Sequence, residues 1–171
     1  MNRRTILLFF LAFFFGVFFQ GCSLSYSFTG ASIPLEAKTI SIGYFSNEAA
    51  LINPALSSTL TDALRDRFAS QTRLDLVNSR GDLSIEGHIT GYTASPTAIQ
   101  GNDVAAQYRL TVTVKVIFVN NVDETQNFEQ SFSRFEDYSS TLDLNVVQDN
   151  LVATITEALV DDIFNKAVVN W

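Results

Sequence analysis

The chain has 171 residues, a formal net charge of −7 and a hydrophobic content of 47%. This length suits one domain with a sizeable core, and the excess of acidic residues excludes general binding of nucleic acid, whose phosphates require a basic surface. The single cysteine excludes an intrachain disulfide, so the stability of the fold must come from packing.

The chain begins with the layout of a secretory signal. Arg3 and Arg4 precede an apolar run that ends at Phe19, shortly before Cys22. The run has about 14 residues, fewer than the ~20 that a membrane-spanning helix needs. Residues 1–21 are therefore predicted to be a signal peptide. Its removal leaves a mature chain with nine basic residues against eighteen acidic ones.

Cys22 predicts a covalent lipid. The residues Phe19-Gln20-Gly21-Cys22 resemble the lipobox of bacterial lipoproteins, in which a cysteine after a small residue receives a thioether-linked lipid and becomes the mature N-terminus. Phe at the first place and Gln at the second depart from the strict Leu-(Ala/Ser)-Gly-Cys pattern. The alternative is an ordinary signal followed by a free thiol. We expect lipid on Cys22 and no other cofactor.

Residues 22–37 are predicted to form a lipidated N-terminal tether, because this stretch is mixed in composition and turn-prone. A single domain is expected over residues 38–171. It begins with a strand, since Ile40, Ile42 and Tyr44 alternate with small residues and predict one buried face.

Asn53-Pro54 predicts the start of an amphipathic helix, because an Asn oxygen caps free amides and Pro has no amide to leave unpaired. The apolar residues of this helix recur at helical spacing, at Leu56, Leu60, Ala63, Leu64 and Phe68. Two strands are expected next, at residues 74–76 and 83–89. Gly87 and Gly91 predict a bulge or a close backbone approach there.

A loop over residues 94–103 precedes the strongest strand pattern in the chain. The apolar face of this predicted central strand consists of Tyr108, Leu110, Val112, Val114, Val116 and Phe118. Its polar face consists of Arg109, Thr111, Thr113 and Lys115. Such alternation predicts a long strand with one buried side.

Residues 120–125 are predicted to turn the chain into an antiparallel partner strand, marked by Phe128 and Phe132. Phe135 has the opposite parity, which predicts a bulge or the end of pairing near Arg134.

Residues 143–171 are expected to form one long helix with an apolar residue at every fourth position from Val147 to Ala167. The order strand, helix, several strands, helix predicts an α+β fold. We expect a two-layer sandwich in which a mixed, mostly antiparallel sheet of four to five strands is covered on one face by two helices.

Patterns of catalytic residues are absent from the sequence. His88 is the only histidine, and neither another His nor a Cys lies at ligand spacing from it. We therefore expect neither enzyme activity nor a metal site. The enzyme alternative is a small hydrolase with His88 as its base.

Three basic residues form the candidate contact site. Arg109 and Lys115 lie on the polar face of the central strand, and Arg134 lies on its partner strand. Such a cluster suits the phosphates of a lipid head group or an acidic partner loop. The alternative is that these side chains only keep the sheet face soluble.

Five stretches resemble the LPS-assembly lipoproteins (LptE type) of Bacteroidota, and they cover residues 26–34, 53–57, 109–115, 127–133 and 162–171. The resemblance implies a sheet covered on one side by two helices. It also implies an outer-membrane lipoprotein that faces the periplasm, partners a β-barrel translocon and helps it assemble and deliver lipopolysaccharide to the outer leaflet. Direct contact with lipopolysaccharide stays open. The alternative is a generic periplasmic lipoprotein scaffold of another envelope complex.

Overall fold

The structure is a computed structural model that describes residues 33–97 and 107–168. The predicted signal peptide, Cys22 and the tether up to residue 32 lie outside the described residues. So do residues 98–106, which include most of the predicted loop, and Trp171.

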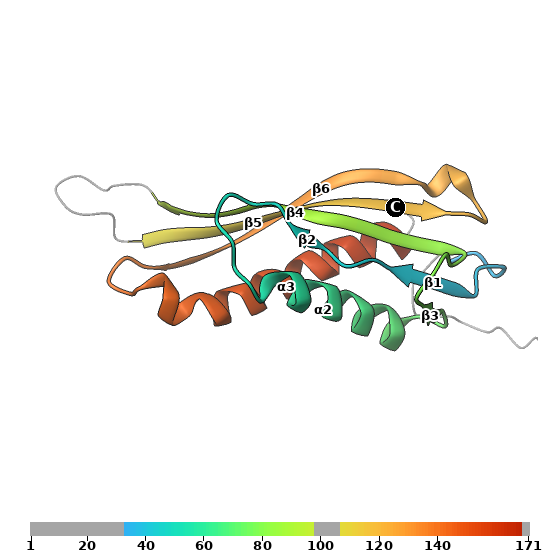
Figure 1. The fold of residues 1–171 in the computed structure, drawn as a ribbon, viewed down its shortest axis with the longest axis horizontal. Helices are drawn as coiled ribbons and strands as arrows, with labels where there is room; N and C mark the ends of the chain where they lie inside the picture. The colour runs from blue at the N-terminus through green and yellow to red at the C-terminus, as the bar shows by residue number, and fades with distance from the viewer. Residues whose placement is uncertain (1–32, 98–106, 169–171) are drawn as a thin grey trace, which may run out of the picture.

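Six strands form one sheet in the order β3-β1-β4-β5-β6, and β2 pairs separately with β4. Their bounds are Thr39–Ile42 for β1, Ser46–Asn47 for β2, Asp75–Val77 for β3, Leu83–Pro96 for β4, Gln107–Asn120 for β5 and Phe128–Ser139 for β6. The short strands pair in parallel, whereas β4, β5 and β6 form an antiparallel meander. Figure 1 shows these three long strands running the length of the molecule.

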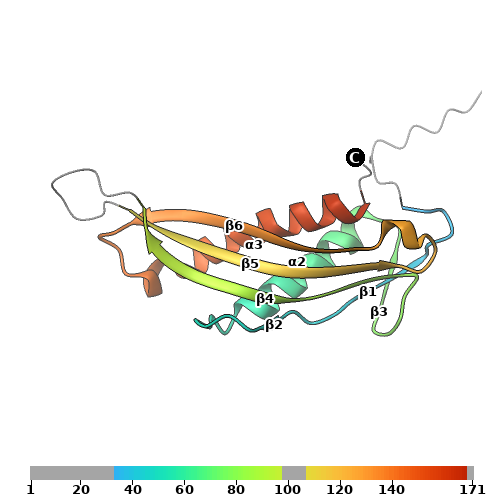
Figure 2. The same ribbon diagram turned by 90° about the horizontal axis from the view of Figure 1, so that it is seen from above.

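Two helices, α2 (Leu56–Gln71) and α3 (Leu144–Val168), cover one face of the sheet, as Figures 1 and 2 show. The short 3-10 helix η1 (Glu124–Gln126) lies in the turn between β5 and β6. The core fills the space between the two layers. The rings of Phe68 and Phe164 join the two helices at a centroid distance of 5.0 Å. The predicted α+β sandwich is confirmed.

The predicted entry into the first helix is confirmed in its mechanism. Asn53 Oδ1 accepts hydrogen bonds from the amides of Ala55 and Leu56 at 2.9 and 3.2 Å. These amides have no partner within the helix, so the Asn side chain satisfies them. The helix itself begins at Leu56, two residues after Pro54, the predicted first helical position.

The predicted parity of the first strand is wrong beyond Ile42. Tyr44 is 63% exposed, and Phe45 is fully buried in its place. From the end of β1 to the start of β2 the chain advances four residues while β4 advances three. The extra residue moves every following side chain to the other face.

A close approach accommodates Phe45. A Cβ added at Gly87 would lie 2.6 Å from the Phe45 ring and 2.3 Å from the Lys115 carbonyl oxygen, so only glycine fits. The Phe45 amide donates to the Thr61 hydroxyl at 3.1 Å. The prediction for Gly87 is confirmed, and the register shift between Ile89 and Gly91 confirms the predicted bulge.

The strands β4 and β6 are longer than predicted. β4 continues through Pro96, so the first residues of the predicted loop are strand. β6 pairs with β5 without a register shift from Phe128 to Ser139. The predicted bulge near Arg134 is therefore wrong, and Phe135 keeps its opposite parity by pointing to the other face of the sheet.

The chain enters the domain through contacts that begin before β1. Ala37, the last residue of the predicted tether, is fully buried. The carboxylate oxygen Oδ2 of Asp82 accepts from the amides of Lys38 and Thr39 at 2.8 and 3.0 Å, and from the Thr39 hydroxyl at 3.0 Å. These hydrogen bonds, led by that from the Lys38 amide, lower the pKa of Asp82 below its usual value of 3.8. Among the described residues, no helix has the length and hydropathy to cross a membrane.

Candidate interaction surface

The face of β4, β5 and β6 that points away from the helices is called the open face here. Even-numbered residues of β5 are buried against the helices, so its odd-numbered residues form the open face with their neighbours on β4 and β6. Small hydroxyl side chains dominate this face, among them Thr93, Ser95, Thr111, Thr113, Ser131 and Ser133. The Thr113 and Ser133 hydroxyls lie 3.0 Å apart and share a hydrogen bond.

Arg109 is held on the open face by two contacts from β6. Its Nε and Nη2 atoms donate to Asp137 Oδ1 and Oδ2 at 2.8 and 3.0 Å. Its guanidinium carbon lies 3.6 Å from the centroid of the Phe135 ring, a cation–π distance. The hydrogen bond raises the pKa of Arg109 and lowers the pKa of Asp137. Both groups are therefore charged at neutral pH.

Lys115 lies on the same face and has its own carboxylate partner. Its Nζ atom is 2.5 Å from Glu129 Oε1, and the hydrogen bond from Lys115 lowers the pKa of Glu129. His88 pairs with Lys115 across β4 and β5. The His88 Nε2 atom lies 3.8 Å from Glu48 Oε2.

Arg134 lies on the opposite face of the sheet. It pairs with Val112, a fully buried residue of β5, and therefore points to the helix side. There its Nε and Nη2 atoms donate to Asp162 Oδ2 and Oδ1 of α3 at 2.6 and 2.5 Å. The structure thus brings Arg109 and Lys115 onto one face and separates Arg134 from them.

The pairing partners are what the sequence interpretation missed. Asp137 and Glu129 neutralise the two cations of the open face, and Phe135 stacks on one of them. The sequence did contain a signal for these pairs, because Arg109 and Lys115 on one strand of the hairpin are matched by Asp137 and Glu129 in reverse order on the other. The prediction of a bulge near Arg134 excluded this pairing, because a shift of register there would have moved Asp137 away from Arg109.

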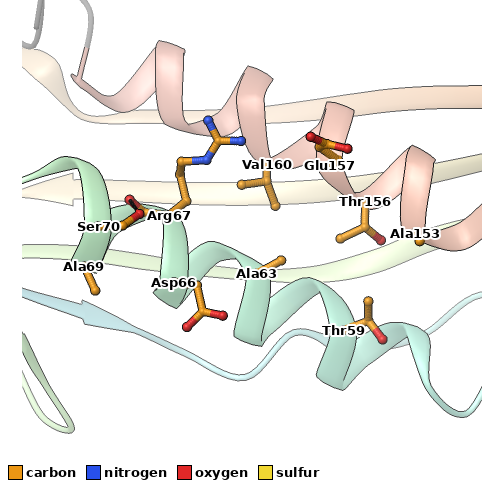
Figure 3. A pocket seen from close by; sticks show the side chains of 10 residues that line it. All are labelled: Thr59, Ala63, Asp66, Arg67, Ala69, Ser70, Ala153, Thr156, Glu157 and Val160. Carbon is orange, nitrogen blue, oxygen red and sulfur yellow. Dashed lines mark hydrogen bonds between the residues drawn. The ribbon is translucent and has the colours of Figure 1, made fainter.

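A groove of about 730 Å³ lies between the two helices, on their side away from the sheet. Figure 3 shows side chains from both helices around it: Thr59, Ala63, Asp66, Arg67, Ala69, Ser70, Ala153, Thr156, Glu157 and Val160. An ion pair between Arg67 and Asp161 joins the helices beside it. The Thr156 hydroxyl is buried and makes no hydrogen bond within the described part of the chain. The groove contains no histidine or cysteine that would serve as base or nucleophile.

The open face offers hydroxyl groups and two ion pairs, which suit hydrogen bonding to a polar partner. Within residues 33–97 and 107–168, no group of three or more His, Cys, Asp or Glu side chains is placed to hold a metal ion.

Comparison with solved structures shows the same fold in two bacterial proteins. A minor lipoprotein from Acinetobacter baumannii has a TM-score of 0.50 at 15% identity, over 76% of this chain and 91% of that one. The hypothetical protein CT253 from Chlamydia trachomatis has a TM-score of 0.51 at 9% identity, over 78% of this chain and 99% of that one. No curated protein matches.

A family model identifies the chain. The model described as lipopolysaccharide-assembly (LptE) matches residues 37–167, which is nearly the whole described domain. The chain belongs to the LptE family of lipopolysaccharide-assembly proteins.

Proposed function

We propose that this protein is an outer-membrane lipoprotein that faces the periplasm, partners a β-barrel translocon and helps it assemble and deliver lipopolysaccharide to the outer leaflet. The match to the lipopolysaccharide-assembly family over residues 37–167 carries this proposal. Signal cleavage before Cys22 and lipid on its thiol supply the membrane attachment. In this proposal the protein acts as a binding module and not as an enzyme.

The open face is the proposed contact with the partner. Both helices lie on the other side of the sheet, so a wide, polar surface is available for docking. Arg109 and Lys115 contact either the barrel or phosphate groups of lipopolysaccharide on this face. Arg134 faces the helix side, so its proposed contact with the partner lies outside the open face. Because each cation already has a carboxylate partner, a phosphate would have to share or displace Asp137 or Glu129.

Depletion and purification test the translocon partnership. We expect depletion to lower lipopolysaccharide at the cell surface, and we expect a β-barrel protein to co-elute with the membrane-extracted lipoprotein. Unchanged surface lipopolysaccharide together with normal barrel folding would contradict the proposal. Co-elution of a different envelope complex under those conditions would favour the alternative, a generic periplasmic scaffold.

A charge swap tests Arg109 as a contact residue. In the double variant Arg109→Asp with Asp137→Arg, the ion pair remains but the positive charge moves to β6. If Arg109 contacts the partner, this variant folds normally and yields less co-purified barrel. If Arg109 only neutralises Asp137, the swap leaves the amount of co-purified barrel unchanged. The matched control is the same swap at an ion pair between the two helices, Arg67→Asp with Asp161→Arg, which also keeps the net charge.

The lipid on Cys22 is tested separately. Cys22→Ser is expected to release the folded domain from the membrane fraction, because the proposed lipid on this thiol supplies the attachment. Mass spectrometry of the mature wild-type N-terminus should find acyl chains on the Cys22 thiol. An unmodified thiol on a membrane-bound protein would refute the anchor.

A further inference from the structure

β6 is a long, regular edge strand. It spans 12 residues, pairs with β5 without a register shift and contains no proline. The opposite edge strand, β3, has only 3 residues. Proteins usually blunt their edges with short strands, bulges or prolines, because an edge presents unpaired backbone groups to other chains. In this fold the β3 edge is short, whereas the β6 edge is long and has neither a bulge nor a proline.

Side-chain hydrogen bonds reveal which backbone groups of β6 point outward. The Ser133 hydroxyl donates to the Val112 carbonyl at 3.4 Å, so that carbonyl faces β6. The Thr90 hydroxyl donates to the Thr113 carbonyl at 3.3 Å, so that carbonyl faces β4. Backbone groups alternate along an antiparallel ladder, and even-numbered residues of β5 therefore bond to even-numbered residues of β6.

The odd-numbered residues of β6 direct their amide and carbonyl groups to the free edge. They are Glu129, Ser131, Ser133, Phe135 and Asp137. β5 is the only neighbour of β6 in the described sheet, and no bond from a described turn or loop reaches these groups, so they have no backbone partner there. The register of the meander thus leaves a row of backbone donors and acceptors along β6 that could pair with one additional strand.

Helix α3 lies beneath this edge. Asp162 pairs with Arg134, and Lys166 Nζ lies 5.7 Å from the centroid of the Phe128 ring. Figure 2 shows α3 running beside β6. The free edge of β6 and the neighbouring side of α3 are together called the β6 ledge. The ledge exposes the outward backbone groups of β6, and α3 lies next to them on the helix side of the sheet.

The position of α3 limits which chains can pair with β6. A second copy of this domain would bring its own α3 beneath its own β6. Paired strands are about 4.8 Å apart, whereas packed helices need about 8–10 Å between axes. The two copies of α3 would therefore collide. An extended segment without an attached helix layer has no such conflict.

Side chains on the ledge define the chemistry of that segment. Phe135 is 51% exposed on the open face. Glu136 points to the helix side, and it forms no ion pair with any described residue. Because a paired strand also alternates, an apolar residue opposite Phe135 and a basic neighbour opposite Glu136 would complement both faces.

We propose that the β6 ledge binds an extended segment of another protein by strand addition, with an apolar residue opposite Phe135 and a Lys or Arg opposite Glu136. Backbone hydrogen bonds to the odd-numbered residues supply the affinity, and these two side chains supply the selectivity. The inference does not depend on the translocon partnership, because it rests only on β6 and α3.

A peptide probe tests the proposal on the lipidated mature chain in detergent micelles. The probe is a synthetic peptide of about nine alternating Thr and Val residues, with Leu and Lys at the two complementary positions. In the free protein, amides of even-numbered β6 residues exchange slowly with solvent and those of Ser131, Ser133 and Phe135 exchange fast. Binding should slow these three amides. No binding at about 1 mM probe, or binding that leaves them unprotected, overturns the proposal.

Two backbone substitutions make the test specific. Ser131→Pro removes an outward amide without touching the bonds to β5, so it should fold and bind the probe about tenfold more weakly than the matched control Ser131→Ala. Equal binding by the two variants refutes the proposal. The same probe with N-methyl groups on its pairing amides should also lose binding to the unaltered protein. Retained affinity of the methylated probe refutes strand addition even if Ser131→Pro does not fold.

Discussion

Replacing Phe45 tests the most consequential difference between the sequence pattern and the fold. Alternation predicts that Tyr44 points into the core, whereas the structure buries Phe45 completely and exposes 63% of Tyr44. Truncation of a fully buried Phe to Ala costs about 3–5 kcal/mol, because apolar contact is lost and a cavity remains. Truncation of an exposed side chain changes stability by about 0.5 kcal/mol or less.

The size of this loss makes it easy to measure. A domain of ~130 residues unfolds with an entropy of about 0.27 kcal/mol per kelvin, so a loss of 4 kcal/mol lowers Tm by about 15 °C. Thermal and urea unfolding of Phe45→Ala, followed by circular dichroism, should show this shift, while Tyr44→Ala should melt within about 2 °C of the unaltered protein. A larger loss for Tyr44→Ala than for Phe45→Ala would refute the one-residue shift between β1 and β2.

Two further predictions concern backbone packing and acid stability. Gly87→Ala should lower Tm, because the added Cβ would meet the Lys115 carbonyl oxygen at 2.3 Å. Adding Phe45→Ala should not restore the Tm, since that carbonyl stays in place. An unchanged Tm for Gly87→Ala would contradict this close approach. Asp82→Asn should lower Tm near neutral pH, since it removes the charged acceptor at the start of β1. The folded pKa of Asp82 lies below its usual 3.8, so its contribution is complete above pH 3.8 and is lost as the pH falls through the folded pKa. The difference in Tm between Asp82→Asn and the unaltered protein should therefore shrink below that pH. A constant difference down to pH 2 would contradict a stabilising role for the charged Asp82 carboxylate.

The faces of the three candidate contact residues could be predicted only in part from the sequence. Arg109 and Lys115 belong to the alternation of β5 itself, so their common face could be predicted from a single strand. Arg134 belongs to β6, and its face depends on the register of the hairpin. Continuous pairing places it opposite Val112, on the helix side, where Asp162 of α3 holds it. A prediction from one strand could not include that helix.

Local patterns determined the class of this fold. Alternation identified the buried face of β5, the Asn53 side chain predicted the entry to α2, and apolar spacing predicted α3, because each signal is contained within one element and repeats its own period. Residue types at Cys22 and along five stretches of the chain led to the family, and the family model agrees over residues 37–167.

The tertiary structure alone decided the features that depend on pairing between distant segments. The burial of Phe45 follows from one extra residue against β4. The ion pairs of Arg109 and Lys115 on the open face follow from their exact partners across β5 and β6. A shift of a single residue in either register would reverse these assignments without changing the alternation of any strand. The free edge of β6 has the same origin, because an edge is a property of the order of strands in the sheet and not of the strand itself.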